Sequence, residues 1–288
     1  MARGGRRRYD EVDGLLLLNK PAGMTSNRAL QTVRRLLNAK KAGHTGSLDP
    51  SATGMLPLCF GEATNVSAFL LDADKTYRVT ARLGTATTTG DADGGETIAT
   101  GAVPELSFEE WDDILQGFRG ELLQVPPMYS ALKKDGKRLY ELARKGESVE
   151  REPRPIRIDD ISLLEAAGTR LVFRVTCSKG TYVRVLVEDI AKAAGTVGHT
   201  ARLHRESVGP FRAEEMVDLA SIEARAEEDR EALRASLLAP DVALQGLPAV
   251  EISAEDGAKF SGGQRVAGVR AESVGTVRVY AAGQVFLG

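Results

Sequence analysis

Hydrophobic and polar positions along the chain recur at two spacings, one typical of strands and one typical of helices. Residues 14–19 form an apolar run that predicts a buried strand, and residues 75–83 alternate as a half-buried strand does. Residues 29–37 place apolar side chains on one face of a helix, which Thr25 or Ser26 can cap. The chain therefore mixes both kinds of element.

The same spacings predict most of the remaining body. Strands are expected at residues 55–60 and 171–177, and helices at residues 62–71, 108–118, 138–145, 182–194 and 218–238. The last of these is predicted as one long amphipathic helix. Residues 43–54 lack periodicity and contain three glycines and a proline, so we expect a loop there.

Beyond residue 240 the pattern changes. Residues 240–248 have the composition of a linker, and β-rich runs at 249–253, 277–280 and 285–287 follow around a short helix at 254–260. We therefore expect three parts: a basic tail at residues 1–10, a mixed α+β body at residues 11–240 and a small β-rich module at residues 247–288.

Composition narrows the class of protein. The 288 residues are 42% hydrophobic and 27% charged, as in ordinary globular proteins. No segment approaches the roughly 20 apolar residues of a membrane helix, and the run after the basic start, residues 15–18, is too short for a signal peptide. Cys59 and Cys177 form no CxxC pair, so we expect no disulfide, no zinc site and a cytoplasmic location.

Charge is balanced in total but not along the chain. Lysine and arginine number 38 and aspartate and glutamate 40, for a net charge of −2. Residues 28–41 nevertheless hold five basic side chains and no acid. A second basic cluster contains Lys133, Lys134, Lys137, Arg138, Arg144, Lys145, Arg151, Arg154 and Arg157. Because a polyanion responds to the local field, such clusters favour an RNA partner, with solvated helix faces as the alternative.

The segment around Asp49 holds the most specific chemistry. Residues 43–57 read GHTGSLDPSATGMLP. Gly46 and Gly54 permit backbone angles closed to other residues, and Pro50 biases Asp49 toward an extended conformation. Such a loop can hold one carboxylate in a defined place, although an aspartate before proline also serves as a plain turn former.

Several segments in register resemble one known family. They read LNKPAGMTS at 18–26, the loop at 43–57, GEAT at 61–64, LLDADKTYR at 70–78, LGT at 83–85, PPMYSALK at 126–133 and CSKGTYVR at 177–184. In this order they are similar to the signature of the TruB family of tRNA pseudouridine synthases. The C-terminal module resembles a PUA domain, an RNA-binding β-fold.

The resemblance implies a fold and a reaction. The fold is the pseudouridine synthase fold, an α+β architecture with a mixed, largely antiparallel central sheet flanked by helices, and an RNA-binding thumb inserted at about 124–157. The reaction flips the uridine at position 55 of the tRNA T loop out of its helix and isomerises it to pseudouridine. Because no electrons or phosphates are exchanged, we expect no cofactor and no metal.

The resemblance also assigns residues to the site. Asp49 is the catalytic carboxylate, and both attack on C1′ and removal of a ribose proton to give a glycal remain open. Tyr77 stacks on the extracted uracil, and its hydroxyl can take the C5 proton. Arg184 pairs with Asp49 and keeps it ionised. Without the resemblance, Tyr77 and Arg184 would be read as a strand tyrosine and a surface arginine.

A second group of residues is implied to contact the substrate. Leu203 lies against the base, His44 enters the RNA loop, and Lys20 supports the site rather than reacting. A core leucine and a structural histidine are the plain alternatives. The full set is Lys20, His44, Tyr182, Leu203, Lys133, Lys134 and Arg138. The implied partner is the T arm of tRNA, bound by a monomer.

Three other functions compete with this interpretation. Ser130 and Lys133 fit the S-x-x-K pattern of serine acyl hydrolases, but the S-D-N and K-T-G elements are missing. Asp91 and Asp93, like Asp72 and Asp74, resemble pieces of a calcium loop, although the third carboxylate position is a glycine. A non-catalytic RNA-binding protein on the same scaffold is the third.

Overall fold

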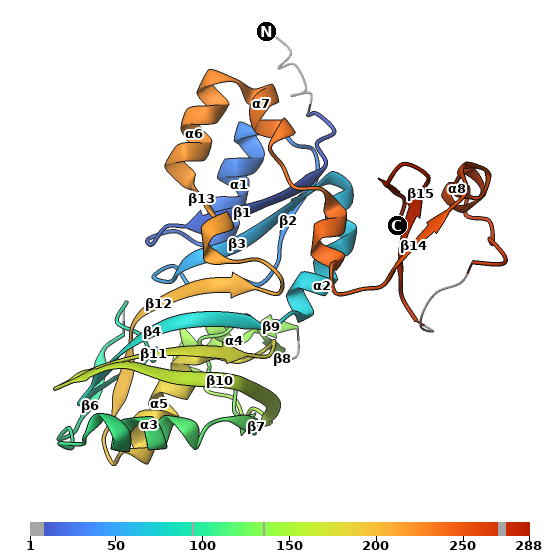
Figure 1. Ribbon diagram of the computed structural model, residues 1–288. Helices are drawn as coiled ribbons and strands as arrows, with labels where there is room; N and C mark the ends of the chain where they lie inside the picture. Colours follow the sequence, from blue (N-terminus) through green and yellow to red (C-terminus); the bar gives the residue numbers. More distant parts are fainter. Residues whose placement is uncertain (1–8, 94, 135, 270–274) are drawn as a thin grey trace, which may run out of the picture.

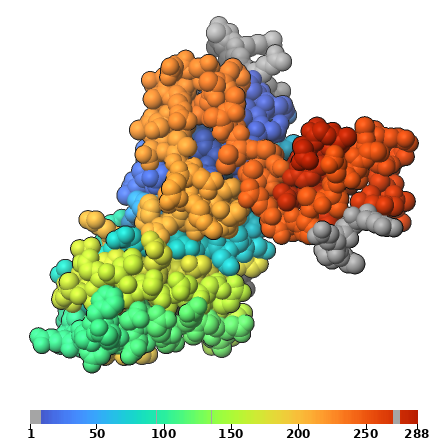
Figure 2. All heavy atoms as spheres, in the orientation of Figure 1, coloured from blue at the N-terminus to red at the C-terminus, as the bar shows by residue number. Residues whose placement is uncertain are grey.

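The computed structural model describes residues 9–93, 95–134, 136–269 and 275–288. Most of the expected basic tail at residues 1–10, including its arginines, lies outside the described residues. Figure 1 shows a main body built on one twisted sheet and a smaller C-terminal unit beside it, which Figure 2 shows projecting from the body. In the described ranges no helix has the length and apolarity needed to cross a membrane.

One large sheet organises the main body. Its strand order is β13-β1-β3-β12-β4-β11-β10-β7, with β2 also paired to β3. Only the pairs β1–β13 and β3–β12 are parallel among these described strands. The expected mixed, largely antiparallel sheet is therefore confirmed. The strands are β1 (Gly14–Lys20), β2 (Ala42–His44), β3 (Thr53–Phe60), β4 (Lys75–Leu83), β7 (Gly120–Gln124), β10 (Arg154–Ala167), β11 (Arg170–Cys177), β12 (Gly198–Val208) and β13 (Val217–Asp218).

Helices cover the sheet, and their starts follow from their caps. Thr25 accepts a hydrogen bond from the Arg28 backbone at 3.1 Å, and Ser107 forms a capping box with Glu110. The helices of the body are α1 (Ser26–Leu36), α2 (Ser67–Asp72), α3 (Phe108–Gln116), α4 (Leu139–Ala143), α5 (Val183–Ala193), α6 (Leu219–Glu228) and α7 (Arg230–Ala235). Short 3₁₀ turns are η1 (Gly61–Val66), η2 (Ala213–Glu215) and η3 (Pro240–Leu244).

Successive side chains of a strand point to opposite faces of the sheet, so the main body has separate hydrophobic cores on the two faces. Leu16 and Leu18 of β1 pack with α1, α6 and α7, whereas Leu15 and Leu17 face the layer that contains η1 and α2. A third core lies between α3, α5 and strands β4, β10 and β11. The opposite face of β4 is open, and its Arg78 is exposed.

The expected long helix at residues 218–238 is wrong in one respect. The chain forms two helices, because Asp229 adopts an extended conformation with φ −153° and ψ 102°. Its carboxylate accepts hydrogen bonds from the Glu231 and Ala232 backbones at 2.9 and 3.1 Å and so begins α7. An aspartate competes well for such a capping position, and amphipathic spacing alone does not reveal it.

Two long strands were not predicted at all. β10 and β12 carry charged side chains at many positions, so neither shows a clear apolar alternation. The residues expected as a loop at 43–54 also enter strands at both ends, in β2 and β3. The predicted helix at 62–71 divides into η1 and α2. In contrast, the strand expected at 75–83 has the bounds of β4.

The C-terminal unit is a small β domain, as expected. It contains β14 (Ala249–Ile252), β15 (Arg278–Ala281), β16 (Val285–Phe286) and α8 (Ala254–Ser261). Val250, Ile252 and Val279 form its core. The preceding linker is not free chain, because Tyr280 donates its hydroxyl to Asp241 at 2.7 Å.

Two hairpins leave the main sheet. β5 (Thr85–Thr87) pairs with β6 (Thr97–Thr100), and β8 (Lys133–Lys134) pairs with β9 (Lys137–Arg138). The second hairpin and α4 belong to residues 125–153, the excursion between β7 and β10. The sequence stretch at 124–157 thus begins and ends inside strands of the main sheet.

At the centre of the sheet, β12 approaches β3 closely at Gly54. This glycine has φ +99°, and a Cβ built on it would lie 2.3 Å from the Arg205 carbonyl oxygen. No side chain fits there without moving the backbone. Gly54 therefore allows the parallel pairing of β3 with β12, directly after the loop that carries Asp49.

We predict that Gly54→Ala destabilises the protein more than Gly120→Ala. Gly120 has a similar φ of +104° but an open environment, so its replacement adds only the left-handed strain. Strain of this kind costs about 1–3 kcal/mol, and overpacking at Gly54 adds about 1–3 kcal/mol more. Equal losses for the two variants in denaturant unfolding would contradict the close approach.

Candidate active site

Asp49 lies in an irregular segment whose backbone is held by side chains from other elements. Ser26, at the start of α1, accepts a hydrogen bond from the Leu48 backbone at 2.8 Å and donates to the Leu48 carbonyl at 3.1 Å. Both Ser26 and Leu48 are buried. Both main-chain polar groups of Leu48, the residue before Asp49, are thus hydrogen-bonded to one side chain.

The residue after Asp49 is held in the same way. The Pro50 carbonyl accepts from the Gly23 backbone at 2.9 Å and from Lys20 Nζ at 3.3 Å. Lys20 is completely buried and also donates to the Pro21 and Met24 carbonyls at 2.8 Å. Burial lowers the pKa of Lys20 to about 8, while the Asp49 charge acts to raise it. Lys20 therefore supports the loop, and its Nζ is directed at main-chain carbonyls rather than at a substrate.

Arg184 connects Asp49 to two other segments. Its Nε lies 3.0 Å from Asp49 Oδ2, and its terminal nitrogens donate to the Thr89 carbonyl at 2.7 Å and the Tyr129 carbonyl at 2.8 Å. The side chain is only 8% exposed. Because every nitrogen of the guanidinium has a partner, the group is held in one orientation, with Nε directed at Asp49.

Asp91 is a member of the site that sequence reasoning missed. Its carboxylate lies 3.9 Å from Arg184 NH1 and accepts from the Thr89 hydroxyl at 2.8 Å. In sequence it looked like a fragment of a calcium loop. The only available signal was its place just after the β4–β5 region, which the fold brings back against Thr200 of β12.

The Asp49 carboxylate lies in a depression. Its side chain keeps 43% of its surface exposed, and it shares a shallow cavity with Asp91, Arg184, Thr200 and Leu203. Burial by the surrounding walls raises its pKa, Arg184 lowers it, Asp91 raises it and Lys20 lowers it. The result is a carboxylate that is open to a substrate on one side and surrounded by protein on the others.

Tyr77 and Leu203 lie beside this depression. Tyr77, on β4, is 9% exposed and packs in the same core as Leu48 and Ala52, on either side of Asp49. Burial is the largest influence on the pKa of Tyr77 and raises it, and the Asp49 charge raises it further. Leu203 is half-buried and lines the cavity itself.

Two further predicted residues, His44 and Tyr182, are not among the residues that line the cavity. His44 is half-buried on β2, its Nδ1 has no hydrogen-bond partner in the part of the chain that the structure describes, and burial lowers its pKa, which favours the neutral ring at pH 7. Tyr182 precedes α5, where Gln124 binds both its backbone N–H, at 2.8 Å, and its carbonyl, at 3.1 Å.

The predicted basic residues of the excursion lie elsewhere. Lys133, Lys134 and Arg138 are all exposed on the β8–β9 hairpin, where Lys133 pairs with Arg138 across the two strands. Lys134 donates to the Glu150 carbonyl at 2.7 Å. These cations do not line the Asp49 cavity, but Arg184 links the cavity to Tyr129, in the same excursion.

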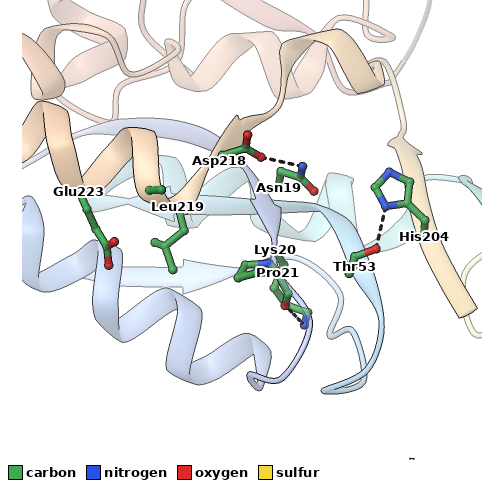
Figure 3. A pocket seen from close by; sticks show the side chains of 9 residues that line it. Asn19, Lys20, Pro21, Thr53, His204, Asp218, Leu219 and Glu223 are labelled. Carbon is green, nitrogen blue, oxygen red and sulfur yellow. Dashed lines mark hydrogen bonds between the residues drawn. The ribbon is translucent and has the colours of Figure 1, made fainter. Parts of the chain in front are cut away.

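A groove opens on the other side of the Lys20 turn. Its volume is about 660 Å³, and Figure 3 shows it between the Lys20–Pro21 turn, His204 and the start of α6. Thr53 and His204 Nδ1 are hydrogen-bonded at 2.8 Å on one wall. Asn19 donates to Asp218 at 2.8 Å on the other. The candidate reacting groups lie in the smaller cavity instead.

The structure does not assemble the competing sites. Among the described residues no group of three or more His, Cys, Asp or Glu side chains could hold a metal ion. Asp72 pairs with Lys179 at 2.8 Å and Asp74 with Arg157 at 3.2 Å. Ser130 is buried whereas Lys133 is exposed, which does not suit a nucleophile and its base.

Family models match almost the whole chain. Residues 34–183 match the model described as TruB family pseudouridylate synthase, N-terminal domain. Residues 184–245 match the tRNA pseudouridylate synthase B C-terminal domain, and residues 248–288 match Pseudouridine synthase II TruB, C-terminal.

Individual proteins are similar over the same length. A tRNA pseudouridine synthase B from Hydrogenovibrio crunogenus is 48% identical over 283 residues, covering 98% of this chain and 90% of the relative. One from Ectopseudomonas mendocina is 52% identical over 270 residues, covering 93% and 88%. A chain in a crystal structure of a Cbf5–Nop10–Gar1 complex has a TM-score of 0.74 at 27% identity, covering 95% of this chain and 76% of that one.

We predict that Ser26→Ala weakens both the fold and the site. The change leaves the buried Leu48 N–H without its partner, which costs about 1–3 kcal/mol, and it frees the residue before Asp49. Unfolding by denaturant measures the first effect. The control is Ser236→Ala, which removes an exposed hydroxyl bonded to the Leu233 carbonyl at 2.7 Å and is expected to stay within about 0.5 kcal/mol of the wild type. Equal stabilities for the two variants would show that Ser26 does not hold the loop.

Proposed function

Because the chain belongs to the TruB family of pseudouridine synthases and isomerises uridine to pseudouridine in tRNA, we propose that Asp49 is its catalytic carboxylate and the T-loop uridine at position 55 its target. The observation that carries the proposal is the 3.0 Å contact between Arg184 and Asp49 in a cavity open to solvent. A nucleoside swung out of its helix can reach this carboxylate.

The chemistry fits one ionised acid. The bond from N1 to C1′ breaks, the uracil turns, C5 bonds to C1′, the C5 proton leaves and N1 takes a proton. Asp49 either adds to C1′ or removes a ribose proton to give a glycal, and both routes need the carboxylate form. Arg184 favours that form, because its positive charge opposes the rise in the pKa of Asp49 that burial causes.

Tyr77 and Leu203 supply the walls for the base in this proposal. Stacking of a base on an aromatic ring is worth about 1–3 kcal/mol, comparable to the few kcal/mol needed to flip it out. The Tyr77 oxygen is the candidate acceptor of the C5 proton, which requires that the phenol first passes its own proton to another group, and the raised pKa of Tyr77 opposes that loss. His44 and Tyr182 border the RNA loop, and the neutral ring of His44 suits stacking in place of the departed base.

The RNA path follows the exposed cations. We assign residues 11–240 to the catalytic domain and the stretch at about 124–157 to a thumb that closes over the T arm with Lys133, Lys134 and Arg138. The unit at 247–288 is a PUA-like domain that grips the acceptor stem. Most of the large apolar side chains exposed on the described surface are spread over different elements, apart from Phe69 and Leu71 on α2, which supports a monomer. Buried free Cys59 and Cys177 fit a cytoplasmic location.

We predict that Asp49→Asn abolishes turnover but spares tRNA binding. The amide keeps the shape of the side chain and loses the charge that both routes require. Tritium release from C5-labelled uridine in tRNA measures turnover, and filter binding measures affinity. Asp113→Asn, on the exposed face of α3, is the control and is expected to behave as wild type. Wild-type tritium release from Asp49→Asn would defeat the assignment and leave a non-catalytic role for the site.

We predict that tRNA affinity falls steeply as salt rises, and that the hairpin contributes to this slope. Replacing Lys133, Lys134 and Arg138 by glutamine should reduce the slope of log affinity against log salt by about one unit per lost phosphate contact. The control replaces Arg225 and Arg230, exposed on α6 and α7. An unchanged slope in the hairpin variant would exclude the hairpin from the RNA interface.

A further inference from the structure

Arg205 lies on β12 between the two strands that lead to the proposed catalytic groups. In the ladder with β3 it pairs with Gly54, and in the ladder with β4 it pairs with Tyr77. Asp49 belongs to the loop that enters β3. One residue of the central strand is therefore a neighbour of both parts of the site.

The Arg205 guanidinium is buried and directs its donors at main-chain oxygens. The residue is 1% exposed, its Nε donates to the Met55 carbonyl at 2.6 Å, and its NH2 donates to the Gly46 carbonyl at 2.9 Å. These carbonyls stand on either side of Asp49 in the sequence. One planar group thus ties together the two ends of the loop.

This buried charge lacks a counter-ion in the ranges that the structure describes. None of the ion pairs there includes Arg205. Its charged neighbours Lys20 and Lys75 are themselves buried cations, and Arg205 acts to lower the pKa of each. Burial of an unpaired charge is unfavourable, so the guanidinium is retained at a cost to folding.

The same guanidinium borders the Tyr77 hydroxyl. Burial raises the pKa of Tyr77, whereas the charge of Arg205 and its hydrogen bond to the phenol oxygen act in the opposite direction. The net effect is a raised pKa, so the phenol keeps its proton, and the guanidinium beside its oxygen fixes where the hydroxyl points.

We propose that Arg205 is a positioning residue for the isomerisation, which fixes both ends of the Asp49 loop and orients the Tyr77 hydroxyl toward the target base. The proposal rests on the proposed roles of Asp49 and Tyr77. Arg205 itself touches no substrate, because its side chain is enclosed by the strands that it joins.

The shape of the guanidinium is essential to this role. Nε and NH2 reach two carbonyls in different directions within one plane, and Tyr77 takes a further contact. An ammonium group is a point charge on a flexible stem and cannot hold these separated acceptors in one fixed geometry. Arg205→Lys therefore keeps the charge and removes the arrangement.

The test compares Arg205→Lys and Arg205→Met with wild type at saturating enzyme in a single turnover. We expect the rate of pseudouridine formation to fall about 100-fold, as for a small misplacement of reacting groups, while the tRNA Kd changes less than about threefold. Rates within about threefold of wild type would overturn the proposal. Failure of both variants to fold, judged by circular dichroism, would assign Arg205 to folding alone and overturn it equally.

A matched control lies on the neighbouring strand. Arg174 of β11 is exposed and paired with Glu206 at 2.7 Å, so Arg174→Lys should keep the wild-type rate. Hydrogen exchange of the amides at 45–56 gives a readout independent of turnover. We expect faster exchange there in Arg205→Lys than in Arg174→Lys, and equal exchange would count against the tie between the loop ends.

A double-mutant cycle with Tyr77→Phe separates positioning of the hydroxyl from a general loss of structure. If Arg205 acts through that hydroxyl, Arg205→Lys lowers the rate by a smaller factor in the Tyr77→Phe background than in wild type. Equal factors in both backgrounds would overturn the Tyr77 part. Asp49→Asn keeps the two proposals distinct: an inactive Asp49→Asn beside active Arg205 variants rejects only this inference, whereas an active Asp49→Asn rejects the proposed function.

Discussion

The loop that carries Asp49 depends on hydrogen bonds from side chains to its backbone. Between β2 and β3 the chain leaves the strand ladder after Thr45, which donates to the Pro57 carbonyl at 3.1 Å, so the following polar groups need partners from elsewhere. Ser26 holds Leu48 from α1, Lys20 holds Pro50 from the turn after β1, and Arg205 holds Gly46 from β12. Because these elements meet at one place only in the complete sheet, the geometry of the acid is a property of the whole body.

The sequence predicted best the elements whose periodicity is set by a buried face. The bounds of β4 and the capped start of α1 followed from alternation and from a capping residue. β10 and β12 were not predicted, because charged side chains occupy their open face and bulges interrupt their registers. The break between α6 and α7 at Asp229 was not predicted for another reason. A capping residue inside an amphipathic stretch leaves the spacing of the apolar side chains unchanged.

The site shows the same division. Asp49, Tyr77 and Arg184 could be proposed because contiguous motifs carry them, and the fold places Asp49 and Arg184 in one cavity and Tyr77 in the core that contains Leu48 and Ala52. Asp91 and Arg205 could not, since their roles arise from contacts between segments far apart in the chain. Only the strand register shows that Arg205 stands between Gly54 and Tyr77. A single buried cation in a polar strand carries no motif.

The hydrogen bond from Arg184 to the Tyr129 carbonyl has a mechanical consequence. The guanidinium that aligns the acid also anchors the root of the excursion between β7 and β10. A displacement of that root acts directly on the group that contacts Asp49, without a relay of intermediate residues. A ligand that moves the Tyr129 segment therefore also acts on the alignment of the Asp49 carboxylate.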